Sequence, residues 1–102
     1  MKTQKKENKK QYVMVRTYSA GVFAGYIKWR KGKECEMTSA RRMWHWEGAA
    51  SLSELAMRGT SKPNECRFPQ EVASVILTEV IEIIKISKKA EENIKGVPLW
   101  TK

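Results

Sequence analysis

The chain has 102 residues, 41% of them hydrophobic, and its 20 Lys and Arg against 11 acidic residues give a formal net charge of +9. This length predicts one domain with a small core and excludes a multidomain enzyme. The basic balance favours polyanionic partners such as nucleotides or nucleic acid, although excess lysine also serves solubility alone. No apolar run reaches the ~20 residues of a membrane-spanning helix, so we expect no membrane partner.

Residues 1–10 are rich in lysine and show no apolar periodicity. We therefore expect a disordered tail, followed by a single domain over residues 11–102. No apolar run follows the lysines, as a secretory signal requires, so we expect a cytoplasmic protein. In that compartment Cys35 and Cys66 are expected to be buried, reduced thiols.

Alternating apolar and polar side chains predict strands at residues 11–18 and 22–30, with a tight turn at residues 19–21 between them. Gly25 lies inside the second strand, which indicates a bulge or the close approach of another backbone. A third, short strand is expected over residues 34–38. These three strands form a meander.

Residues 40–46 combine aromatic and basic side chains and are expected to form a separate fourth strand. Ser51 and Glu54 have the spacing of a capping box, which predicts the start of a short helix. Gly59 is a natural C-terminal stop for this helix. Residues 60–69 are expected to be a loop, because proline and asparagine recur there.

Residues 72–86 are rich in β-branched side chains, which favours one or two strands, with a helix as the alternative. Ser87 is expected to cap a final short helix that ends at Gly96. The apolar segment 97–100 is expected to pack back onto the sheet. The predicted fold is therefore α+β, an antiparallel sheet of about five or six strands with two short helices.

The chain has few residues that could serve in catalysis, since it contains no aspartate and a single histidine, His45. This histidine lies between two tryptophans in an expected strand, a setting typical of a packed or hydrogen-bonded residue rather than a general base. The two cysteines and His45 lack the short spacing of a zinc site, and no glycine-rich phosphate loop is present. We expect a protein that is not an enzyme and holds no metal or cofactor.

The strongest candidate for a ligand-binding group lies within residues 40–46. The guanidinium groups of Arg41 and Arg42 can bind phosphate oxygens, and the indoles of Trp44 and Trp46 can stack on a base. In a strand, Arg42 shares its face with both tryptophans, whereas Arg41 points to the other side. The alternative is that the tryptophans belong to the core and the arginines pair with glutamates.

A second basic and aromatic group comes from the first hairpin. Its members lie on the faces opposite the β-branched residues: Tyr12, Arg16, Tyr18, Tyr26, Lys28 and Arg30. In the expected register they lie side by side on a solvated face. This chemistry is typical of nucleic-acid-binding sheets, although no RNP or KH motif is present. The alternative is that these side chains only cover the sheet surface.

Several strings of the sequence together resemble a small domain family of unknown function found in tailed bacteriophages and prophages. They are VRTYSAGV at 15–22, ARRMWHWEGAASLSELA at 40–56, CRF at 66–68, LTEVIEI at 77–83 and VPLW at 97–100. The resemblance covers about residues 12–100 and brings no catalytic assignment with it. It implies a phage context, in which small basic proteins counter host defence by binding an effector or sequestering a nucleotide signal.

These observations lead to a main hypothesis and two alternatives. The main hypothesis is a non-enzymatic phage accessory protein, a homo-oligomer in the cytoplasm of the infected bacterium, that binds an anionic nucleotide-type ligand. Its expected ligand-binding residues are Arg16, Tyr18, Arg41, Arg42, Trp44 and Trp46. One alternative is a single-stranded nucleic-acid-binding protein that uses Tyr12, Tyr26, Lys28 and Arg30. The other is an inhibitor that docks on a host defence protein.

Overall fold

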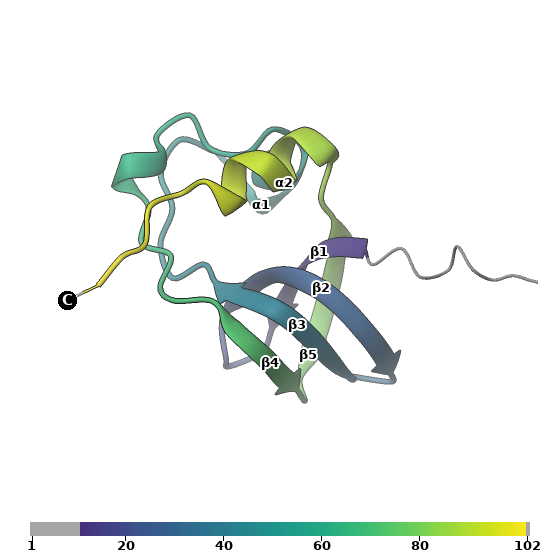
Figure 1. Cartoon of the computed structure of the whole chain (residues 1–102). Coiled ribbons are helices and arrows are strands. Elements are labelled where there is room, and N and C mark those ends of the chain that lie inside the picture. Colours follow the sequence, from purple (N-terminus) through teal and green to yellow (C-terminus); the bar gives the residue numbers. More distant parts are fainter. Residues whose placement is uncertain (1–10, 102) are drawn as a thin grey trace, which may run out of the picture.

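The computed structural model describes residues 11–101, and the tail expected at residues 1–10 lies outside them. Within the described part, five strands and two helices follow one another (Figure 1): β1 (Gln11–Thr17), β2 (Val22–Lys31), β3 (Glu34–Arg42), α1 (Leu52–Arg58), β4 (Val72–Leu77), β5 (Val80–Lys85) and α2 (Lys88–Lys95). A short 3-10 helix, η2 (Pro63–Glu65), precedes β4. The predicted α+β fold is confirmed, with a five-stranded antiparallel sheet in this part of the chain.

The sheet has the strand order β4-β3-β2-β1-β5, so the consecutive strands β4 and β5 form its two opposite edges. Only Thr78 and Glu79 connect these two strands, which requires a strongly curved sheet (Figure 1). Two backbone hydrogen bonds hold the connection in place. The amide of Val80 donates to the carbonyl of Lys33 at 2.9 Å, and the amide of Tyr18 donates to the carbonyl of Glu79 at 2.9 Å.

The strand β1, which lies between β2 and β5, is buried on both faces, because the curved sheet encloses one core and the helices cover a second. Val13 and Val15 belong to the inner core, to which all five strands contribute: Val13, Val15, Phe23, Cys35, Met37, Ala40, Leu77 and Val80. Tyr12 and Met14 point to the outer face, where they pack with α1, α2 and the loop before β4. Figure 1 shows both helices lying together over one end of the sheet.

Gly25 makes the close approach that its position predicts. A Cβ atom on residue 25 would lie 2.8 Å from the Cα of Ala40, so only glycine fits between the two strands. The register of β2 against β3 shifts between Ala24 and Tyr26. Across from this bulge, Ser39 adopts a φ of 48°, which is uncommon outside glycine.

The separate fourth strand expected over residues 40–46 is wrong. Residues Ala40 to Arg42 are the end of β3, which runs without a break from Glu34. The physical reason is that β4 pairs on both sides of the irregularity at Ser39, so the strand continues through it. Beyond Arg42 the backbone forms only an isolated bridge, between His45 and Arg67.

The remaining elements agree with the predictions. Residues 72–86 form the two strands β4 and β5, and the helical alternative is wrong. The hydroxyl of Ser51 accepts a hydrogen bond from the amide of Glu54 at the start of α1, and Ser87 caps α2 in the same way. Neither helix of the described chain has the length and apolar character needed to cross a bilayer.

Candidate functional site

A pocket of about 480 Å³ opens where the turn between β1 and β2 meets the segment that follows β3. It is lined by Ser19, Ala20, Gly21, Val22, Arg42, Met43, Trp44 and Trp46. Three of the six predicted ligand-binding residues, Arg42, Trp44 and Trp46, therefore line one cavity. Its volume lies within the roughly 300–1,000 Å³ usual for small-molecule sites.

Backbone hydrogen bonds hold the segment after β3 in an extended form. The amide of Met43 donates to the carbonyl of Val22 at 2.8 Å, and the amide of Arg67 donates to the carbonyl of His45 at 2.7 Å. Met43 is buried in the core. Because successive side chains of an extended segment alternate in direction, the buried Met43 sends Trp44 to the opposite side, toward the surface.

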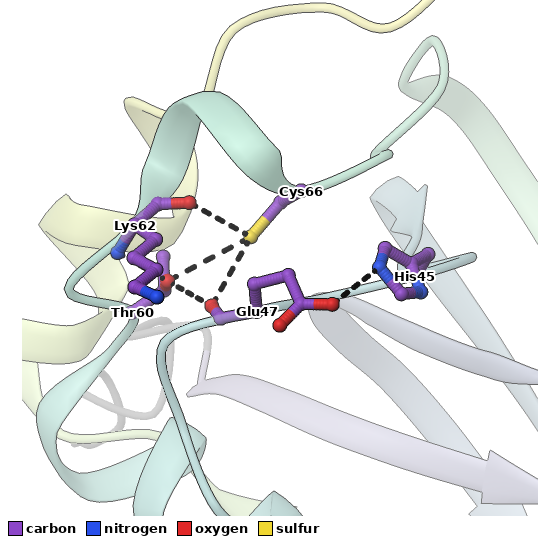
Figure 2. Close-up of polar contacts among 5 residues, drawn as sticks. All are labelled: His45, Glu47, Thr60, Lys62 and Cys66. Carbon is purple, nitrogen blue, oxygen red and sulfur yellow. Dashed lines mark hydrogen bonds and ion pairs between the residues drawn. The ribbon is translucent and has the colours of Figure 1, made fainter.

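A polar cluster fixes the backbone directly after Trp46 (Figure 2). The hydroxyl of Thr60 donates to the carbonyl oxygen of Glu47. The buried thiol of Cys66 lies 3.6 Å from the same oxygen and 3.7 Å from the Thr60 hydroxyl. The exposed imidazole of His45 contacts the Glu47 carboxylate at 3.0 Å. The loop before β4 thus holds in place the segment that carries the tryptophans, and Cys66, like Cys35, is a buried free thiol as expected.

Arg42 provides the positive charge of the pocket. Its guanidinium carbon lies 4.6 Å from the centre of the Phe23 ring, a cation–π contact that orients the side chain. Within residues 11–101 the guanidinium of Arg42 makes no hydrogen bond and no ion pair, and the residue is exposed. No residue within 11–101 thus occupies its N–H donors, which are available to an anion.

Trp44 belongs to an aromatic stack that the sequence analysis did not identify. Its ring and that of Trp100 are stacked with centroids 5.2 Å apart and planes inclined by 24°. The guanidinium of Arg67 lies 5.8 Å from the centre of the Trp100 ring. Trp44 remains 59% exposed, so its free face is accessible to a ligand. In the sequence, the only sign of these partners was that Arg67 and Trp100 lie in CRF and VPLW, two of the strings that resemble the phage family.

Arg41 points to the other side of β3, as its position predicts, but its donors are occupied. The buried guanidinium donates to four backbone carbonyl oxygens at 3.1 to 3.2 Å, those of Phe68, Pro69, Ile94 and Pro98. Burial lowers the pKa of this guanidinium from its ordinary value. In place of the expected phosphate contact, Arg41 joins β3, the loop before β4, the end of α2 and the C-terminal segment.

Arg16 and Tyr18, the other two predicted ligand-binding residues, do not line the pocket. The Nε atom of Arg16 forms an ion pair with the carboxylate of Glu82 at 2.8 Å, across β1 and β5. Tyr18 is 79% exposed and directly precedes the turn that forms one wall of the pocket. Neither residue is therefore part of the candidate site.

The solvated tyrosine face expected on the first hairpin does not form, because α2 covers it. Tyr12 is buried and packs edge to face with Tyr26, with ring centres 5.1 Å apart. The ammonium of Lys95 lies 5.0 Å and 4.7 Å from these two rings and pairs with Glu91 at 2.8 Å. Of the four residues expected to bind single-stranded nucleic acid, Tyr12, Tyr26, Lys28 and Arg30, only the last two are exposed.

Where α2 covers the first hairpin, burial and ion pairing shift the pKa values of side chains. Burial raises the pKa of Tyr12 to about 12, and the hydrogen bond from Lys95 lowers the pKa of Glu91. An open cavity of about 890 Å³ adjoins Tyr12 and Tyr26 and also contains Arg41 and Lys95. The cations in this cavity are already bound to carbonyl oxygens and to Glu91. The smaller pocket at Arg42 is therefore the stronger candidate for an anionic ligand.

The family described as a domain of unknown function (DUF6948) matches residues 10–94, which is most of the chain. No curated protein and no solved structure matches the chain.

Proposed function

The chain belongs to the DUF6948 family, a domain of unknown function, and we propose that it binds an anionic nucleotide-type ligand without chemical conversion. One observation carries this proposal. Arg42, whose guanidinium has no partner among residues 11–101, lines the same cavity as two indole side chains, Trp44 and Trp46.

The pocket supplies the two interactions that nucleotide binding requires. The free face of Trp44 is a stacking surface for a base, an interaction worth about 1–3 kcal/mol in nucleic-acid complexes. A charge-assisted hydrogen bond from Arg42 to a phosphate oxygen contributes about 1.5–3 kcal/mol. Among the described residues that line the pocket, Arg42 is the one cation, which suits a ligand with a single phosphate beside the base.

The biological role that we propose is sequestration. The resemblance to phage domains supports a protein that acts in an infected bacterium and removes a nucleotide signal of host defence from circulation. Such a protein needs affinity for its ligand rather than a catalytic group. The pocket walls of indole, arginine and backbone fit that requirement.

A second candidate function is binding of single-stranded nucleic acid. The observation that favours it is the stack of Trp44 on Trp100 with Arg67 beside it, which extends aromatic and basic surface beyond the pocket. Successive bases stack on such platforms with little sequence preference. The formal net charge of +9 would strengthen binding to a polyanion.

Titration calorimetry of the full chain separates the two functions. The probes are the four nucleoside 5′-monophosphates and a thymidine oligonucleotide of about ten nucleotides. We expect a monophosphate to bind with a 1:1 stoichiometry and a shallow salt dependence, because one phosphate is contacted. Binding of the oligonucleotide alone, with a steep salt dependence, would favour the second candidate. Failure of all the probes would overturn both.

Two substitutions that each remove one positive charge test whether Arg42 contacts the phosphate. Arg42→Ala should weaken binding of the monophosphate about ten- to a hundredfold. Arg30→Ala removes the same charge from an exposed position on β2 and should leave the affinity unchanged. Equal losses in both variants would show that the effect comes from net charge and not from the pocket.

A further inference from the structure

The two edges of the sheet differ in how they are protected against pairing with another chain. An edge strand exposes unpaired backbone N–H and C=O groups, and proteins usually guard such edges with charge or proline. The edge strand β5 carries Glu82 and Lys85, and Glu82 is paired with Arg16. The other edge, β4, has the sequence VASVIL, with no charge, no proline and no glycine.

The outer side of β4 is apolar and accessible. Leu77 is buried in the inner core and Val75 packs against it, so these side chains point inward. Residues of the opposite parity, Ser74 and Ile76, point outward. Val72 is 44% exposed and Ile76 is 57% exposed. The free edge therefore combines unpaired backbone groups with exposed β-branched side chains.

The neighbourhood of β4 is also the least basic part of the chain. Residues 68–84 contain neither lysine nor arginine, although the chain as a whole has 20 of them. The part of β3 that pairs with β4 likewise has no basic residue and contains Glu36, which accepts a hydrogen bond from the Ser74 hydroxyl at 2.6 Å. Two strongly basic molecules can approach each other along this edge with the least repulsion.

We propose that β4 pairs in antiparallel orientation with β4 of a second copy, about a two-fold axis that passes at Ser74. In this register Val72 lies opposite Ile76 of the second copy, and Ala73 lies opposite Val75. Within residues 72–76 each apolar residue thus meets an apolar residue, and Ser74 meets its own copy, a favourable cross-strand pair. The strand is complementary to itself, which is what a closed two-fold contact requires.

This contact joins the two sheets into one continuous sheet of ten strands. No third copy is expected to add to this sheet. Both of its edges are β5 strands, whose charged side chains disfavour pairing with another strand. A polyanion is a poor partner for β4, since Glu36 on the paired strand and Glu71 directly before β4 are both acidic. The observations therefore favour a second copy as the occupant of this edge.

Sedimentation velocity on the full chain tests the contact and its register together. We expect the wild-type protein to sediment at twice its chain mass of 11.8 kDa. The double variant Val72→Lys/Ile76→Lys places like charges opposite each other twice and should dimerise at least about tenfold more weakly. The double variant Val72→Glu/Ile76→Glu should do the same despite its opposite change in net charge.

Mixing the two double variants in equal amounts provides the decisive comparison. Lysines then face glutamates across the two-fold axis, so we expect a mixed dimer to form. Ile81→Lys introduces a lysine at an exposed position of β5 and should leave the dimer unchanged. Circular dichroism confirms that each variant is folded. A monomeric wild type at about 200 µM, or a mixture that remains monomeric, would overturn the proposal.

Discussion

The indole of Trp44 stacks on that of Trp100, with ring centroids 5.2 Å apart and planes inclined by 24°. The contact depends on backbone pairing between distant segments, since the amide of Trp100 donates to the carbonyl of Phe68 at 3.1 Å and the amide of Trp44 to that of Arg67 at 3.1 Å. One face of Trp44 is thus supported by protein, while the residue remains largely accessible. A supported but exposed indole is suited to stacking on a planar ligand.

Trp44→Ala and Trp46→Ala are expected to differ in stability. Trp44 loses an aromatic pair worth about 0.5–1.5 kcal/mol, so its variant should remain folded. Trp46 is partly buried against the core under the helices, and its truncation should cost about 2 kcal/mol or more. Urea unfolding monitored by circular dichroism measures both. Equal losses of stability would show that the two indoles have the same structural role.

Arg41 and Arg42 are adjacent in sequence, but their substitutions should act on different properties. Arg41→Ala leaves four carbonyl acceptors without their donor and should lower the free energy of unfolding by about 3 kcal/mol or more. Arg41→Lys keeps the charge but not the planar set of donors, and should fall between that variant and the wild type.

Arg42→Ala loses only a cation–π contact at an exposed site and should stay within about 1 kcal/mol of the wild type. The midpoints of urea unfolding of the three arginine variants give this order directly. A stable Arg41→Ala variant would contradict the structural role that the carbonyl contacts assign to Arg41.

Local signals in the sequence predicted most of the fold. Ser51 and Ser87 cap their helices through contacts within three residues, and the alternation in β1 and β2 reflects the two faces of the same strands. Gly25 was identifiable because a strand rarely tolerates glycine without a backbone reason. The continuity of β3 was not predictable, because it depends on pairing with β4 across Ser39.

The candidate site was predictable only in part, for a related reason. The face shared by Arg42 and Trp44 follows from alternation within one segment. The different environment of Arg41 depends on carbonyl groups at Phe68, Ile94 and Pro98, which only tertiary packing brings together. The burial of the tyrosine face likewise depends on where α2 lies, which no local pattern encodes.

Tyr12 should ionise at about pH 12, because burial disfavours the phenolate and raises its pKa from 10.0, an effect that the nearby Lys95 ammonium partly offsets. The folded state therefore holds this proton when the unfolded state has lost it. The resulting stability is fully present below about pH 10 and is lost as pH rises toward 12.

Spectrophotometric titration of phenolate absorbance should show this late step in the wild type. Tyr12→Phe should remove the step, while Tyr18→Phe, at an exposed position, should leave it in place. If the late step disappears in Tyr18→Phe and persists in Tyr12→Phe, the assignment of the raised pKa to Tyr12 is wrong.

The central claim is that Arg42 binds the phosphate of a nucleotide. The most direct test measures whether the gain in affinity from that phosphate depends on Arg42. The affinity of a nucleoside 5′-monophosphate is compared with that of the matching nucleoside, in the wild type and in Arg42→Ala. Wild type should bind the monophosphate about ten- to a hundredfold more tightly, and Arg42→Ala should bind both compounds with nearly equal affinity. A phosphate preference that survives in Arg42→Ala would contradict the assignment of this pocket as a nucleotide site.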